Sequence, residues 1–152
     1  MRIGVIGGHL CDDDIAAVAR RVGELVAWEG AALVCGGLGG VMEAAAVGAR
    51  DAGGVVVGIL PGDDIRTANP GVTIPITTGL GEARNVLVVK ASDAVIAIAG
   101  GWGTMSEAAL CFKLGVPLIR LKSDLQNLPS PIAETPEEAV EWAMERARER
   151  WE

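Results

Sequence analysis

The sequence predicts one α/β domain over residues 1–152, with a Rossmann-like, doubly wound parallel sheet of about six strands and helices on both faces. Three observations lead to this prediction. Short apolar segments alternate with helical patterns along the chain, as in repeated βαβ units. The apolar segments are continuous rather than alternating, which is typical of parallel strands covered on both faces. The length of 152 residues suits a single domain with its own core.

Six apolar runs rich in β-branched residues are predicted as strands. The first ends in Gly7-Gly8, the second in Gly36-Gly37, and Pro61 stops the third. Pro75 indicates an edge or irregular strand for the fourth run, because proline cannot donate a ladder hydrogen bond. The six runs cover residues 2–7, 32–35, 55–60, 72–77, 94–99 and 116–121. We expect the strand order 3-2-1-4-5-6, with a ligand crevice where the order reverses.

Five helices are expected, over residues 12–29, 41–52, 82–92, 104–114 and from 136 onward. The acidic run at residues 12–14 favours a helix start, and Gly53-Gly54 and Gly115 are typical helix ends. A polar loop is expected over residues 123–134. Thr135-Pro136-Glu137-Glu138 then forms a capping box, and the last helix is predicted to pack its apolar face on the sheet.

One glycine pattern, GG-x-G-x-x-x-E-A-A, occurs twice in the chain. It lies in CGGLGGVMEAAA from Cys35 and in AGGWGTMSEAAL from Ala99, with Glu43 and Glu107 at the same place. Each copy joins a predicted strand to a predicted helix. Its glycines let the backbone approach a ligand, and the helix start offers free N–H groups to an anion. With Gly8 expected between the two copies, the sequence predicts one anion-binding cleft.

The charged side chains near these turns each have a functional and a structural interpretation. Glu107 lies three residues after Thr104, so both side chains can face the cleft. A carboxylate there would suit the sugar beyond a phosphate, or positive charge at an anomeric carbon. Arg84 would be a fork-shaped phosphate clamp. The alternatives are an ordinary helix surface for Glu107, a solvated face for Arg84 and a structural role for Glu43.

Three further residues near the expected cleft receive weaker interpretations. His9 follows the first strand and is interpreted as a loop histidine rather than a general acid. Trp102, at the tip of the second glycine turn, would pack on a partner subunit or stack on a base. Cys11 precedes three aspartates that raise a thiol pKa, which makes it a poor nucleophile.

Several stretches resemble one known family. GGWGTMSE resembles the PGGxGTxxE motif of the cytokinin-activating phosphoribohydrolase family (Lonely Guy), whose members are often labelled "lysine decarboxylase" by an old misannotation. The run CGGLGGVMEAAAVGARDAGGVVVGILPG resembles the same family's glycine-rich first half. The segment TGLGEARNVLVVKASDAVIAIAGG resembles a subgroup with the molybdenum-cofactor carrier proteins and short uncharacterised members. The resemblance covers residues from about 1 to 121.

The resemblance implies roles for individual residues. Glu107 matches the motif glutamate, which is catalytic in the hydrolases, and Arg84 matches the catalytic or phosphate-binding arginine. Members are generally dimers with the site near the subunit interface. The residues implied for phosphate and nucleotide binding are Gly100, Gly101, Gly103, Thr104, Gly36, Gly37, Gly40, Gly8 and Asn85.

Four departures from the hydrolase pattern weaken the enzyme interpretation. Ala99 replaces the motif proline, and Asn85 replaces a lysine. Gly-Gly-His at residues 7–9 replaces Gly-Ser-Ser, which removes a pair of hydroxyls near the ligand. Glu43 stands where the hydrolases have glycine, which adds a charge close to the cleft.

Two functions therefore stay open. The first is hydrolysis of the N-glycosidic bond of a nucleoside 5′-monophosphate to a base and ribose 5-phosphate. The alternative is a non-catalytic carrier or sensor of a phosphorylated cofactor or nucleotide, similar to a molybdenum-cofactor carrier. The hydrolysis needs no metal or redox cofactor, and we expect no resident cofactor. The first strand ends GGHLCD rather than GxGxxG, which disfavours nicotinamide-dependent oxidoreduction, and no Schiff-base lysine context favours decarboxylation.

Composition limits the possible binding partners and the cellular compartment of the protein. A net charge of −7 disfavours nucleic-acid binding, which needs a basic surface. Three cysteines without a CxxC pattern predict no disulfide framework and no zinc site, and they fit a reducing cytoplasm. We expect no signal peptide and no membrane span. The expected partners are a small phosphorylated ligand and a second copy of the chain, as a homodimer or higher homo-oligomer.

Overall fold

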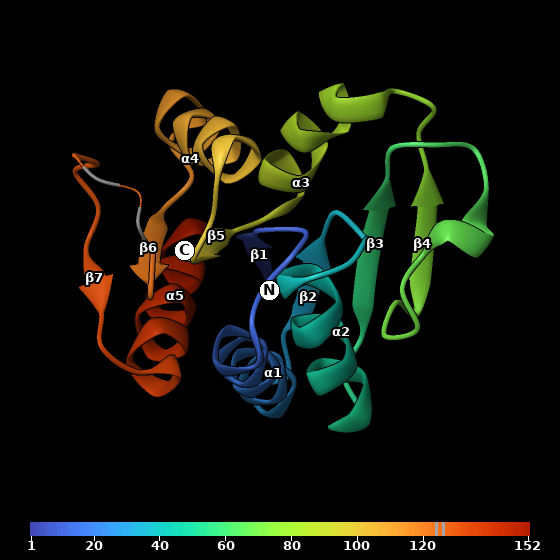
Figure 1. Ribbon diagram of the computed structural model, residues 1–152. Helices are drawn as coiled ribbons and strands as arrows, with labels where there is room; N and C mark the ends of the chain where they lie inside the picture. Colours follow the sequence, from blue (N-terminus) through green and yellow to red (C-terminus); the bar gives the residue numbers. More distant parts are fainter. Residues whose placement is uncertain (124, 126) are drawn as a thin grey trace.

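The computed structural model describes residues 1–123, 125 and 127–152. Within them, strands form one parallel sheet in the order β4-β3-β2-β1-β5-β6-β7 (Figure 1). The strands are β1 (Arg2–Gly7), β2 (Ala32–Cys35), β3 (Val56–Leu60), β4 (Ile74–Thr77), β5 (Ala94–Ile98), β6 (Leu118–Leu121) and β7 (Ile132–Ala133). The predicted Rossmann-like α/β class is confirmed, with seven strands in place of about six.

The predicted strand order 3-2-1-4-5-6 is wrong at the fourth strand. β4 pairs with β3, with Ile74 opposite Val57, and β5 takes the place beside β1, with Ala94 opposite Ile3. The physical reason lies in burial, because every residue of β5 is buried while β4 is mostly exposed and contains Pro75. An apolar, uncharged strand fits the centre of the sheet, and a strand with proline fits the edge.

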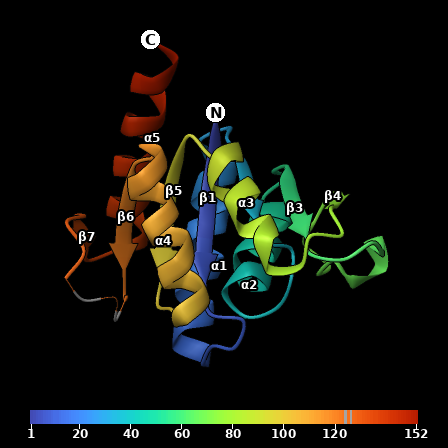
Figure 2. The same cartoon turned by 90° about the horizontal axis from the view of Figure 1, so that it is seen from above.

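Helices cover both faces of the sheet, as expected (Figure 1, Figure 2). One face carries α1 (Asp13–Trp28), α2 (Val41–Asp51) and α5 (Pro136–Trp151). The other carries α3 (Asn85–Ala91) and α4 (Trp102–Leu114). Each face has its own apolar core, and α5 buries Ala143 and Met144 in the larger one. Two short 3-10 turns, η1 (Ile65–Thr67) and η2 (Gly81–Arg84), complete the described elements.

Local chemistry sets the helix ends. Asp12 accepts a hydrogen bond from the Ile15 N–H at 2.8 Å, so the acidic run marks a helix start. Thr135 caps α5 with Pro136 at its first position, and the positive φ of Gly53 follows the end of α2.

Several predicted boundaries differ from the structure, most of them ends of strands or helices that differ by one or two residues. The helix expected over 82–92 is divided into η2 and α3, and α4 begins two residues before the predicted start. The loop predicted over 123–134 contains β7, and its residues 124 and 126 lie outside the described part of the chain. Among the described helices, none is long and apolar enough to cross a membrane.

Candidate functional site

Three glycine turns meet at the carboxyl edge of the sheet. Because β1 has β2 on one side and β5 on the other, the turns that follow these strands are neighbours. The Val41 N–H donates to the Gly8 carbonyl at 2.9 Å, which joins the first two turns. A Cβ at Gly40, where φ is 66°, would lie 2.3 Å from the same oxygen. Glycine is therefore required at the point where the turns touch.

A small cavity of about 300 Å³ opens between these turns and the starts of α3 and α4. This volume lies at the lower end of the range for small-molecule sites. The residues that line it are Gly7, Gly8, His9, Leu38, Met42, Glu82, Arg84, Asn85, Gly101, Gly103, Thr104 and Glu107. The cavity therefore gathers both charged residues that the sequence predicted as catalytic, together with parts of all three glycine turns.

Glu107 is a buried carboxylic acid that faces this cavity. Its exposed fraction is 8%, and burial raises the pKa of its side chain to about 7, with Arg84 opposing the rise and Glu82 adding to it. Among the described residues the carboxyl has no hydrogen-bond partner, and no fully buried side-chain oxygen is left unpaired. The carboxyl oxygens are therefore open to the cavity.

Arg84 links the ends of three elements. Its Nε donates to the Ile59 carbonyl at 3.0 Å, and one Nη donates at 3.4 Å to the Gly36 carbonyl. The other Nη donates to the Asn85 side-chain oxygen. A Cβ at Gly36 would lie 2.7 Å from the Arg84 guanidinium, so that glycine makes room for it. Arg84 thus holds the β2 and β3 ends against α3, and its remaining N–H groups are the ones that a ligand can use.

The turn after β5 is built around a second close contact. At Gly100, where φ is 136°, a Cβ would lie 2.6 Å from the Cβ of Thr104. Only glycine fits there, and the contact folds the turn back onto the first residues of α4. Gly101 precedes the helix, and a Cβ at Gly101 or Gly103 would meet open space. The start of α4 is thus bare backbone on its cavity side.

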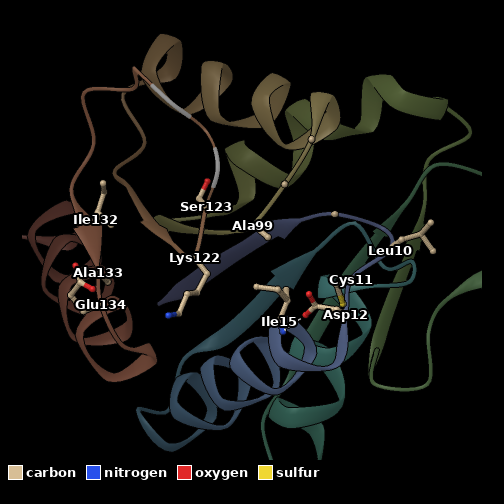
Figure 3. Close-up of a pocket in the computed structure, with 13 residues that line it drawn as sticks. Leu10, Cys11, Asp12, Ile15, Ala99, Lys122, Ser123, Ile132, Ala133 and Glu134 are labelled. Carbon is tan, nitrogen blue, oxygen red and sulfur yellow. Dashed lines mark hydrogen bonds between the residues drawn. The ribbon is translucent and has the colours of Figure 1, made fainter.

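A larger cavity of about 840 Å³ lies beside the small one, towards α1 and β7 (Figure 3). The two share Gly8 and Gly101 as lining residues. Figure 3 shows Lys122, at the end of β6, between Ile15 of α1 and Glu134 after β7. The other residues that line it are Leu10, Cys11, Asp12, Ala99, Gly100, Ser123, Ile132 and Ala133.

Two residues of the larger cavity have a left-handed backbone without being glycine. φ is 50° at Ala99 and 51° at Lys122, and the Ala99 N–H donates at 3.2 Å to the carbonyl of Leu121, next to Lys122. This conformation costs about 1–2 kcal/mol per residue. Proline, which fixes φ near −65°, cannot replace alanine here, so Ala99 marks a turn with a different backbone from the PGG motif.

Comparison with known proteins decides the family, because residues 1–149 match the SLOG cluster4 family. The chain belongs to the SLOG cluster4 family. A protein from Archaeoglobus fulgidus is 47% identical over 144 residues, which are 95% of each chain.

Two solved structures resemble this SLOG cluster4 chain over nearly its whole length. The molybdenum cofactor binding protein from the phototrophic bacterium Rippkaea orientalis is 38% identical, with a TM-score of 0.89 over 95% of each chain. The molybdenum cofactor carrier protein from Chlamydomonas reinhardtii is 31% identical, with a TM-score of 0.87 over 97% of this chain and 98% of that one. The predicted resemblance to the subgroup with molybdenum-cofactor carriers is confirmed.

The predicted site residues fall into two groups in this SLOG cluster4 chain. Those that line the small cavity are Gly8, Arg84, Asn85, Gly101, Gly103, Thr104 and Glu107, and Gly100 lines the large one. Gly36, Gly37 and Gly40 line neither cavity and instead shape the turn after β2. The binding roles of all these residues stay predictions.

Glu43 differs from what the repeated motif implies. It is exposed and lines neither cavity, whereas Glu107 is buried in one. Glu43 is the third residue of α2, but Glu107 is the sixth of α4, because the two helices begin at different points of the motif. Glu43 therefore does not contribute to the wall of either cavity.

The remaining candidates keep simpler roles. His9 is an exposed residue at the rim of the small cavity. Trp102 is 90% exposed, and the homodimer that would cover it stays a prediction. Partial burial and then Asp12 and Asp13 raise the pKa of the Cys11 thiol, as expected.

Other cavity residues were not predicted from the sequence. Lys122 was missed, although its place directly after a strand was a usable signal. Within the described chain, no group of three or more metal-ligating side chains gathers.

Proposed function

We propose that this chain binds a phosphate-bearing cofactor of the molybdenum-cofactor type and carries it without chemical change. The observation that carries the proposal is the pair of cavities that share Gly8 and Gly101. One elongated ligand with a phosphate near the shared wall would occupy both. The two solved relatives support this choice of cargo, because both are named for binding or carrying the molybdenum cofactor.

The start of α4 supports phosphate binding at the shared wall. The N–H of Met105 bonds back to the Gly101 carbonyl at 2.9 Å, so the N–H groups of the three residues before it have no carbonyl within the helix. These groups and the positive end of the helix dipole attract an anion. Gly101 and Gly103 leave this backbone uncovered, and Lys122 adds a cation on the large cavity.

The departures from the hydrolase pattern support carriage rather than turnover. Asn85 stands where the hydrolases have a lysine, so the small cavity lacks that cation. Arg84 already has protein acceptors for three of its N–H groups, which fixes it as part of the wall. Ala99 holds the turn after β5 in a backbone conformation that the motif proline cannot adopt.

The proposal is tested by two matched substitutions of glycine by aspartate. Gly103→Asp places a carboxylate beside the proposed phosphate, whereas Gly62→Asp places one in a loop outside both cavities. Neither residue has an atom near its Cβ position, so we expect both variants to fold. We expect Gly103→Asp to weaken binding of the free molybdenum cofactor by roughly tenfold or more, from like-charge repulsion. Equal affinities for the wild type and both variants would contradict the proposal.

A second candidate function is hydrolysis of a nucleoside 5′-monophosphate at its N-glycosidic bond. Glu107, with its pKa raised to about 7 in a cavity, is the observation that favours it. Its carboxylate would stabilise positive charge at the anomeric carbon or orient a water molecule. Release of a free base by the wild type, lost in Glu107→Gln with binding retained, would establish this activity. A panel of nucleoside monophosphates without base release would exclude it for those substrates.

A further inference from the structure

The small cavity contains two polar groups that point to the chemistry of a ring rather than to a phosphate. The Glu107 carboxyl and the Asn85 amide both line it, and both side chains are more than nine-tenths buried. A carboxylate repels a phosphate, and it pairs with the part of a ligand that donates hydrogen bonds. The carboxyl oxygens have no partner among the described residues and open to the cavity, so they are available to accept hydrogen bonds from a ligand.

Arg84 determines which end of the Asn85 amide is free. The guanidinium donates to the Asn85 oxygen, which leaves the amide N–H₂ of Asn85 as the end that a ligand can use. The guanidinium is itself held by the Ile59 and Gly36 carbonyls, so this orientation is fixed from behind. The cavity thus presents an acceptor, Glu107, and a donor, the Asn85 amide.

We propose that Glu107 and Asn85 recognise the 2-amino-4-oxopyrimidine edge of a bicyclic ring, the edge that pterins and guanine share. This edge carries an amino group, a ring N–H and a carbonyl in a row. The two donors fit a carboxylate as a bidentate pair, and the carbonyl accepts from the Asn85 amide. The inference deepens the proposed function and rests on it for the choice of this cleft as the ligand site.

The same pair of groups discriminates against related rings. Adenine presents a bare ring nitrogen beside its amino group, so a lone pair would face the carboxylate. Lumazine, the pteridine with a carbonyl in place of the 2-amino group, would place that oxygen against Glu107. A site built around buried polar groups rejects such analogues, because its own groups are then left unpaired.

Two pairs of probes test the inference and identify the source of the ring. Pterin is compared with lumazine, and guanosine 5′-monophosphate with inosine 5′-monophosphate, which lacks only the 2-amino group. Dissociation constants are measured by calorimetry at pH 8 for the wild type and Glu107→Gln. The control is Glu43→Gln, which changes the exposed glutamate at the equivalent motif position.

We expect the wild type and Glu43→Gln to prefer the 2-amino ring by roughly 10- to 100-fold in at least one pair. Glu107→Gln should lose that preference, because an amide cannot accept both donors. The preferred pair identifies the source as a pterin or a guanine nucleotide. Equal affinities within both pairs, a preference that survives in Glu107→Gln, or no binding of any probe would overturn the inference.

The outcome separates this inference from the proposed function. Retention of the molybdenum cofactor without a 2-amino preference would contradict the ring recognition and leave carriage standing. A 2-amino preference without retention of that cofactor would contradict carriage and leave the ring recognition standing.

Discussion

At the scale of residues, burial of the Glu107 carboxyl in the small cavity lowers the stability of the folded chain at neutral pH. An acid with a pKa of about 7 in the folded chain and an ordinary value of 4.5 binds its proton more tightly when folded. The free energy of unfolding therefore falls as pH rises from 4.5 to 7, and it falls no further above pH 7 on account of this group. The shift corresponds to about 3 kcal/mol, a large fraction of the stability of an ordinary domain.

Glu107→Gln should remove this pH dependence. The unfolding free energy of the variant minus that of the wild type is the quantity compared. We expect it to be about 2–3 kcal/mol larger at pH 8 than at pH 5, because glutamine has no proton to lose. Urea unfolding at the two pH values measures it, with Glu43→Gln as the exposed control. An equal difference at both pH values would contradict the assignment of a raised pKa to Glu107. The other ionisable groups that face Glu107 or lie near it are Arg84, Glu82, His9, Cys35 and Cys111.

Ala99 is the second residue that departs from ordinary preferences. Restoring the motif proline as Ala99→Pro should lower the unfolding free energy by about 3 kcal/mol or more, because φ is 50° and the N–H bonds to Leu121. Ala99→Gly should be tolerated, since glycine adopts this φ freely. Thermal and urea unfolding of both variants check the prediction. A proline variant as stable as the wild type would show that this turn has the backbone of the hydrolase motif.

At the scale of elements, α1 and α2 pack with their backbones in near contact. A Cβ at Gly48 would lie 2.1 Å from the Arg20 carbonyl, and one at Gly23 would lie 2.0 Å from the Ala45 carbonyl. Because α2 begins directly after the β2 turn, this packing also fixes where that turn sits beside Gly8. Two helical glycines thus help to position the site.

Gly48→Ala should therefore destabilise the fold, although alanine is the better helix former. We expect a net loss of about 1–3 kcal/mol, because overpacking outweighs the gain in propensity. Gly103→Ala is the matched control, since its Cβ meets open space, and it should be neutral or slightly stabilising. Urea unfolding of the two variants decides between these outcomes, and a stabilised Gly48→Ala would refute close packing of α1 on α2.

The sequence predicts the helices and strands of this fold better than it predicts which strands pair in the sheet. Continuous apolar runs and glycine turns located the six longer strands, but periodicity carries no information about which strands pair. Pro75 indicated an edge without saying which one, and β7 is too short for a pattern to be seen. The repeated motif does not show that α4 begins one residue after its glycine pair and α2 four residues after its own, so the motif alone could not separate the exposed Glu43 from the buried Glu107. Lys122 could have been predicted but was not, because it directly follows a predicted strand at the edge of the sheet where ligands bind.

At the scale of the whole molecule, both cavities lie on one edge of the sheet and share a wall of glycines. Bare backbone at the start of α4 suits a phosphate, and a buried acid and amide suit a ring with donors and an acceptor. A carrier must hold its cargo and release it unchanged. This combination therefore supports retention of a phosphorylated cofactor more directly than it supports bond cleavage.

The most direct test of carriage is the recovery of intact cargo from an isolated complex. The chain is mixed with free molybdenum cofactor and separated by gel filtration, and molybdenum and the pterin are quantified in the protein peak. Our proposal predicts stoichiometric molybdenum and a pterin of unchanged mass, with both reduced in Gly103→Asp and retained in Gly62→Asp. Molybdenum that elutes apart from the wild-type protein, or a cofactor recovered in cleaved form, would contradict it.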